Sequence, residues 1–207
     1  MPLLLPKIYP ITDTAISGLS HVEQVRRFVE GGATLVQLRD KNATPREFYE
    51  AAADVMAFAK PLGIRVIIND RVDIALAIGA DGVHLGQDDL PVQYARKILG
   101  EGRIIGFSTH SVEQATAAVG LPLDYIAIGP IFGTMTKQNA DPIVGLGTVA
   151  QVNQMIGEIP LVAIGGIKGV NYQSVIDAGA SSVAIISDLL FDADRITETY
   201  RAMSGER

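Results

Sequence analysis

The 207-residue chain contains no cysteine. This absence excludes disulfide scaffolds, thiolate metal sites and cysteine nucleophiles, and it suits a reducing compartment. No apolar stretch approaches the length of a membrane span, and the opening residues 1–6 are too short and too rich in proline for a signal sequence. We therefore expect a cytoplasmic protein that has no membrane partner.

Positive charge is also scarce, because 17 Lys and Arg residues stand against 23 Asp and Glu residues, for a net charge of −6. This balance argues against a broad nucleic-acid surface, so any phosphate binding must be local. No low-complexity segment or charge block divides the chain, and its length and 48% apolar content suit one full core. We predict a single domain over residues 1–207.

Short β-rich runs alternate with amphipathic segments along the chain. Helix starts are indicated by capping boxes at Ser20-x-x-Glu23 and Thr44-x-x-Glu47, and several glycines mark helix ends. The expected strands are Lys7–Asp13, Leu35–Asp40, Val66–Asp70, Gly82–Gly86, Ile104–Ser108, Tyr125–Gly129, Leu161–Ile164 and Val183–Ser187.

Eight strand–helix units in about 200 residues correspond to the minimum length of an α/β (β/α)8 TIM barrel. A doubly wound open sheet is the alternative, although it seldom runs to eight such even units. In a barrel, function lies at the carboxyl ends of the strands, and the polar residues there become the candidate site.

The end of the second expected strand carries two cations. If the run is a strand, its period of two puts Gln37, Arg39 and Lys41 on one face. Two converging cations repel each other unless an anion lies between them, and a phosphate or pyrophosphate suits both Arg and Lys. The alternative is an edge strand whose charges point to solvent.

Two carboxylates follow neighbouring expected strands. Asp70 and Asp89 could meet at one hard cation, with waters and phosphate oxygens completing the octahedron that Mg²⁺ prefers. The alternative is that both are helix N-caps. Asp88 is adjacent to Asp89 and could take either role.

A second phosphate site is predicted after the seventh and eighth strands. Backbone N–H groups at Gly165-Gly166 and near Ser187 would form the phosphate cradle that barrels commonly use. Two phosphate groups in one pocket suggest a transferase that joins two phosphorylated substrates. The loop ending at Lys137 adds a third cation, and we expect it to act as a lid. The alternative is a static surface loop with a solvated lysine.

The histidines give little support for covalent catalysis. His84 lies in an apolar strand, where a satisfied core histidine or a substrate hydrogen bond is favoured over catalysis, and His110 is expected in the first turn of a helix. Neither has a Ser or Cys partner at a triad-like spacing.

Six motifs in order resemble the thiamine-phosphate synthase family along the whole chain. They are Tyr9-Pro10-Ile11-Thr12-Asp13, Gln37-Leu38-Arg39-Asp40-Lys41, Ile68-Asn69-Asp70, Gly82-Val83-His84-Leu85-Gly86-Gln87-Asp88-Asp89, Gly129-Pro130-Ile131-Phe132-Gly133-Thr134-Met135-Thr136-Lys137 and Ile164-Gly165-Gly166-Ile167. The resemblance implies a (β/α)8 fold and the joining of hydroxymethylpyrimidine diphosphate to thiazole phosphate, with release of pyrophosphate. One departure is Gly133, where the family more often has Pro.

The resemblance also implies roles for individual residues. The pyrimidine diphosphate would be held by Gln37, Leu38, Arg39, Asp40, Lys41, Asn69, Ser108 and Lys137. Of these, the catalytic set would be Arg39, Lys41, Ser108 and Lys137. Mg²⁺, the expected cofactor, would be held by Asp70 and Asp89. The thiazole phosphate would be bound by Thr134, Thr136, Gly166, Ile186 and Ser187.

Three alternatives remain open beside this interpretation: a thiazole tautomerase on the same barrel, another phosphosugar barrel enzyme, and a non-catalytic phosphate-binding barrel. A tautomerase has no diphosphate to bind, and neither of the other two needs the full set of cations and metal carboxylates. The expected partners are small-molecule substrates, with no nucleic acid, and a homodimer is the assembly we would test first.

Overall fold

The computed structural model describes residues 3–133 and 141–205. Strands and helices alternate along the chain in the order expected from the sequence. They are β1 (Ile8–Pro10), α1 (Thr14–Ser17), α2 (His21–Glu30), β2 (Leu35–Leu38), α3 (Pro45–Ala59), η1 (Lys60–Leu62), β3 (Arg65–Asn69), α4 (Val72–Ile78), β4 (Gly82–Leu85), α5 (Val92–Leu99), β5 (Ile104–Thr109), α6 (Val112–Ala118), β6 (Tyr125–Ile128), α7 (Gly145–Met155), β7 (Leu161–Ile164), α8 (Tyr172–Asp177), β8 (Ser182–Ile185), α9 (Ser187–Leu190), η2 (Ala193–Arg195) and α10 (Ile196–Ser204).

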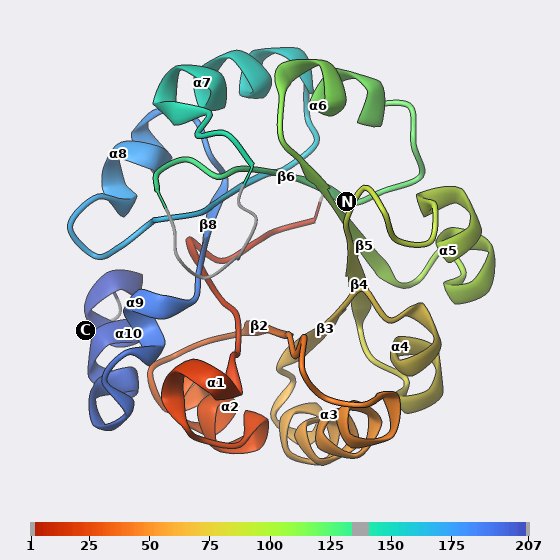
Figure 1. The fold of residues 1–207 in the computed structure, drawn as a ribbon, viewed down its shortest axis with the longest axis vertical. Coiled ribbons are helices and arrows are strands. Elements are labelled where there is room, and N and C mark those ends of the chain that lie inside the picture. The colour runs from red at the N-terminus through yellow and green to blue at the C-terminus, as the bar shows by residue number, and fades with distance from the viewer. Residues whose placement is uncertain (1–2, 134–140, 206–207) are drawn as a thin grey trace.

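The eight strands form one parallel sheet in the order β1-β8-β7-β6-β5-β4-β3-β2. Its two ends meet, because a parallel bridge joins Ile11 to Gln37 and Thr12 N donates to Gln37 O at 2.9 Å. The helices form a ring outside the strands (Figure 1). The expected (β/α)8 barrel is confirmed, and the open doubly wound sheet is wrong.

Local capping signals start several helices as expected. At α3, Thr44 Oγ1 accepts from Glu47 N while the Glu47 side chain accepts from Thr44 N, which completes the capping box. At α2, Ser20 Oγ accepts from Glu23 N, but the Glu23 carboxylate pairs with Arg27 at 3.0 Å. At α2, therefore, only the hydrogen bond to the Ser20 side chain of the expected capping box is formed.

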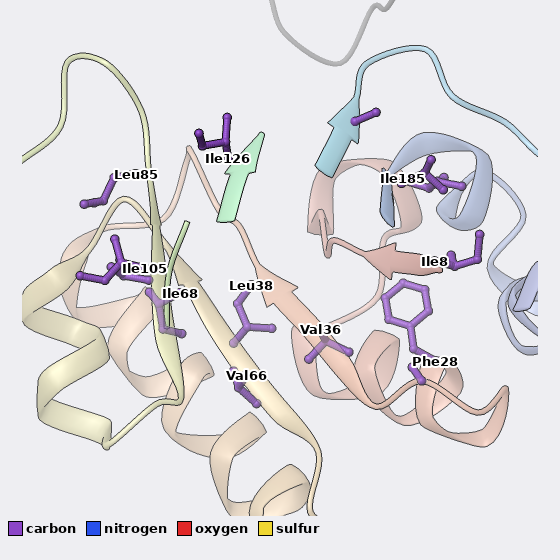
Figure 2. Close-up of a cluster of buried hydrophobic side chains, with 14 of the residues drawn as sticks. Ile8, Phe28, Val36, Leu38, Val66, Ile68, Leu85, Ile105, Ile126 and Ile185 are labelled. Atoms are coloured by element: carbon purple, nitrogen blue, oxygen red, sulfur yellow. The ribbon is translucent and has the colours of Figure 1, made fainter. Parts of the chain in front are cut away.

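Side-chain alternation along the strands produces two apolar cores. Outward-facing residues pack against the helices, and Figure 2 shows part of this layer around Ile8, Phe28 and Val36. Inward-facing residues fill the barrel itself. They are Tyr9, Ile11, Leu35, Ile67, Tyr125, Ala127, Val162 and Ala184.

The first two strands are shorter than expected, and β2 ends at Leu38. Beyond it, Asp40 Oδ1 accepts from the backbone N–H groups of Asn42 at 2.9 Å and Ala43 at 3.0 Å, which bends the chain into a turn. Arg39 and Lys41 therefore belong to a loop. This turn corrects the prediction that the strand period of two places Arg39 and Lys41 on the same face as Gln37.

Among the helices of the described residues, none is both long and apolar enough to cross a membrane.

Candidate active site

A cavity of about 500 Å³ opens where the carboxyl ends of the strands meet. It lies at the barrel face that the sequence predicts, and most of the expected site residues reach it. The expected residues that line it are Gln37, Arg39, Lys41, Asn69, Asp70, Asp89, Ser108, Gly166, Ile186 and Ser187. Thr134, Thr136 and Lys137, together with the expected lid, lie outside the described residues.

Two expected binding residues do not line this cavity. Leu38 is fully buried in the outer core. Asp40 uses its carboxylate to accept from the backbone N–H groups of its own loop and to contact His21 Nε2 at 3.3 Å. Despite partial burial, the backbone hydrogen bonds first, and then His21, keep the pKa of Asp40 below its usual range. In the structure both residues shape the segment that carries Arg39 and Lys41.

Each of the two cations has a carboxylate partner. Arg39 Nη1 lies 3.0 Å from Asp13 Oδ2, and both side chains are largely buried. The Lys41 ammonium group pairs with Asp70. The repulsion expected between two converging cations is thus already relieved by acidic side chains, and an anionic ligand entering here would share or replace these pairs.

The two candidate metal carboxylates are not helix caps. The N-cap of α4 is Arg71 and that of α5 is Pro91, so the capping alternative is wrong for both Asp70 and Asp89. Asp70 has a φ of 62°, and no other non-glycine residue of the described chain has a positive φ. Left-handed backbone at an Asp is uncommon and tends to mark functional sites.

The carboxylate of Asp70 lies close enough to Asp89 to influence its pKa. Burial raises the pKa of Asp89 above its usual range, and the neighbouring Asp70 raises it further, while the hydrogen bond from Gly86 N at 2.6 Å acts in the opposite direction. Two adjacent carboxylates attract a hard cation that prefers oxygen ligands. In the described residues no group of three His, Asp or Glu side chains is placed to hold a metal. Further ligands would come from water or substrate.

The opposite rim holds the two glycine residues and the helix start at which a phosphate cradle is expected. Gly165 and Gly166 have φ angles of 99° and 66°, and α9 begins at Ser187. Among the described residues, the N–H groups of Gly166 and Ser187 donate to no acceptor. A Cβ at Gly166 would lie 2.5 Å from Gly133 O, so both its φ and its packing require glycine.

Both candidate histidines line the cavity and are hydrogen-bonded. His84 Nδ1 lies 2.9 Å from the Tyr125 hydroxyl and Nε2 lies 2.8 Å from Ser108 Oγ. Burial lowers the pKa of His84 to about 4, so its ring is neutral near pH 7. His110 Nδ1 lies 2.7 Å from Gly129 O. The satisfied histidine expected from the sequence is confirmed for His84.

Sequence reasoning missed three residues of this region. Asp13 was not linked to Arg39, and Tyr9 and Tyr125 were not recognised as polar groups inside the barrel. Strand alternation places Tyr125 on the inward face with Ala127, and this signal could have found it.

Comparison with known proteins shows the family of this chain. Residues 8–189 match a family model described as thiamine monophosphate synthase. The chain belongs to this family. Within it, the chain is 46% identical over 188 residues to the thiamine-phosphate synthase of Syntrophomonas wolfei, covering 90% of each protein. It is 44% identical to that of Clostridium novyi, covering 91% of this chain and 92% of the other.

Solved structures agree with the membership in the thiamine monophosphate synthase family. A thiamine phosphate pyrophosphorylase from Pyrococcus furiosus superimposes with a TM-score of 0.86 at 35% identity, over 96% of this chain and 94% of that chain. A tryptophan synthase alpha-subunit from the same organism has a TM-score of 0.71 at 14% identity, and this similarity concerns the barrel fold alone.

Proposed function

We propose that this protein condenses 4-amino-2-methyl-5-hydroxymethylpyrimidine diphosphate with 4-methyl-5-(2-phosphoethyl)thiazole, giving thiamine phosphate and pyrophosphate. The observation that carries the proposal is the family match over residues 8–189. The cavity supports it, because it combines a charged rim at Arg39, Lys41 and Asp70 with a glycine-rich rim at Gly166. One pocket thus offers separate places for a diphosphate and a monophosphate.

The charged residues fit a dissociative reaction. The C–O bond to pyrophosphate breaks with its electron pair leaving on oxygen, and the pyrimidine ring nitrogen and amino group delocalise the resulting cation. Arg39, Lys41 and Lys137 would bind and stabilise the departing pyrophosphate. The thiazole nitrogen then donates its lone pair to the cation, and no protein nucleophile or strong base is required. A neutral, hydrogen-bonded His84 is compatible with this chemistry.

The remaining assignments divide the cavity between the two substrates. Gln37, Asn69 and Ser108 would hold the pyrimidine half. Gly166, Ile186 and Ser187, together with Thr134 and Thr136, would bind the thiazole phosphate. Leu38 and Asp40 would act by supporting the loop rather than by touching substrate, because neither lines the cavity.

Asp70 and Asp89 would hold Mg²⁺. Their paired oxygens suit a hard cation, and the proximity of Asp70 that raises the pKa of Asp89 would favour binding of a positive ion. When bound, Mg²⁺ supplies charge neutralisation for the pyrophosphate leaving group. Lys41, which pairs with Asp70, would then be available to a phosphate oxygen.

The function is tested by supplying both substrates with Mg²⁺ and measuring thiamine phosphate and pyrophosphate together. Formation of both in equal amounts, and of neither when one substrate is left out, is the expected result. Isomerisation of a thiazole phosphate without condensation would indicate a tautomerase. Phosphate binding without turnover would indicate a non-catalytic barrel. A cytoplasmic location, a homodimer and a single domain over residues 1–207 stay predictions, and light scattering tests the second.

A further inference from the structure

A row of hydrogen-bonding side chains crosses the barrel interior and joins two expected substrate-binding residues, Gln37 and Ser108. Gln37 Nε2 lies 3.2 Å from the Tyr9 hydroxyl, which lies 3.2 Å from the Tyr125 hydroxyl. From Tyr125 the row continues through His84, at 2.9 Å from Nδ1, to Ser108 Oγ, at 2.8 Å from Nε2. Both ends line the cavity.

A glycine makes this row possible. His84 on β4 and Tyr125 on β6 are separated by β5, and both pair in register with Gly106. A Cβ at Gly106 would lie 2.0 Å from Tyr125 Cζ and 2.3 Å from its hydroxyl oxygen. The missing side chain therefore lets the Tyr125 ring extend across β5, where it stacks on His84 with ring centroids 5.5 Å apart.

The order of donors and acceptors follows from Gln37, because an amide nitrogen can only donate. Because Gln37 Nε2 donates to the Tyr9 hydroxyl, Tyr9 donates its own proton to the Tyr125 hydroxyl. Tyr125 in turn donates its proton to His84 Nδ1. A neutral imidazole that accepts at Nδ1 carries its proton on Nε2 and donates it to Ser108. The Ser108 hydroxyl is then free to donate its own proton to another acceptor.

We propose that Tyr9, Tyr125 and His84 are positioning residues that hold the Ser108 hydroxyl as a hydrogen-bond donor toward the cavity. Ser108 would accordingly face an acceptor atom of the pyrimidine substrate, a consequence that rests on the proposed function. The same order leaves Gln37 Oε1, which has no partner among the described residues, as an acceptor at the other end. The row thus ends in a hydrogen-bond donor at Ser108 and in a hydrogen-bond acceptor at Gln37.

The protonated nitrogen of His84 tests the order without any assay of activity. Nitrogen-15 NMR of the histidine-labelled protein distinguishes protonated from unprotonated ring nitrogens, and a His84→Gln variant assigns the signal among the three histidines. The expected result is a neutral ring with its proton on Nε2. A proton on Nδ1 would mean that every bond runs in the reverse direction, and this result would overturn the proposal.

Tyr125→Phe tests whether the row positions Ser108. The variant keeps the stacked ring and removes only the hydroxyl. We expect a mixture of His84 tautomers, and a kcat about tenfold lower with little change in the KM for thiazole phosphate, as for loss of one buried hydrogen bond. Unchanged tautomer and kcat would refute the positioning role.

Tyr200→Phe is the matched control, since the buried Tyr200 hydroxyl donates to Ile8 O at 3.2 Å away from the cavity. It should leave the His84 signal and the kcat unchanged while costing some stability. Equal changes in both variants would attribute the effect to general loosening of the barrel and would also count against the proposal. If the wild-type protein fails to make thiamine phosphate, the proposed function is wrong, whereas the NMR result still decides the hydrogen-bond order.

Discussion

The Lys41 ammonium group lies against the Asp70 carboxylate, and this contact links the loop after β2 to the end of β3. A residue expected to bind phosphate therefore neutralises a residue expected to bind Mg²⁺. The pair keeps both side chains at the cavity before any ligand arrives. When Mg²⁺ and a diphosphate bind, two contacts would replace this ion pair. Asp70 would contact the metal ion, and Lys41 would contact a phosphate group.

Removing the Asp70 charge should abolish most of the activity without unfolding the protein. Asp70→Asn is the informative variant because Asn also tolerates the left-handed φ of 62°. We expect its rate to fall by about two to three decades, as for loss of one electrostatic contact in a transition state. Asp89→Ala should behave similarly, since both residues lie in segments that follow strands rather than in the core.

Steady-state rates over a Mg²⁺ titration and thermal melts provide the measurement. Asp73→Asn is the control, because Asp73 is exposed and pairs only with Arg71 in the described structure. Full activity of Asp70→Asn, or of the wild-type protein in excess chelator, would disprove the metal assignment.

Arg39 and Asp13 should differ in their importance for the reaction, although they form one ion pair at 3.0 Å. Arg39→Ala removes a pyrophosphate contact, so we expect a loss of about two to three decades in kcat. Asp13→Asn keeps the α1 N-cap and removes only the charge that competes for Arg39, so its kcat should stay within about threefold of wild type.

Kinetics of both variants with the diphosphate substrate measure this difference. Similar losses in the two variants would show that the ion pair serves the fold of the loop, and the role of Arg39 toward phosphate would have to be abandoned.

Gly166→Val should damage one half of the site. The new side chain enters a left-handed backbone position and would approach Gly133 O to 2.5 Å and Phe132 Cβ to 2.8 Å. We expect the KM for thiazole phosphate to rise about tenfold or more, which corresponds to ~1.4 kcal/mol or more. The affinity for the diphosphate substrate should change much less.

The control is Gly147→Val, because a Cβ at this exposed position of α7 meets no atom within 4 Å among the described residues. Gly147→Val should leave the KM for thiazole phosphate and the affinity for the diphosphate substrate unchanged. Equal damage to both substrates in Gly166→Val would point to misfolding of the whole rim.

The stability of the fold should depend on pH through His84. Burial lowers its pKa in the folded state from 6.5 to about 4, so the unfolded chain takes up a proton first on acidification. The free energy of unfolding should therefore fall as the pH decreases from 6.5 to about 4 and be insensitive to this group above that range. Urea melts of wild type and His84→Gln across this range measure the effect. Parallel pH curves for the two proteins would contradict it.

Much of the fold follows from local patterns. Capping at Thr44 and Ser20, glycine stops and strand alternation depend on neighbours within a few residues, and they identify the alternation of strands and helices. The barrel interpretation then selects the face that carries the site, because parallel strands bring their carboxyl ends together. For this reason Asp70 and Gly166 could be chosen without a structure, whereas the choice of Asp89 over Asp88 came from the family resemblance.

Contacts between residues that are far apart in the sequence could not be predicted from these local patterns. Lys41 reaches Asp70 across 29 positions, and His84 reaches Tyr125 across 41 because Gly106 leaves space on the intervening strand. Leu38 joins the outer core although its neighbours in sequence line the cavity. The residue types, periodicity and caps alone determine which elements form and where the polar groups fall along them. Only closure of the barrel decides which charges pair and which hydroxyls meet, because these contacts depend on the register and spacing of strands far apart in the chain.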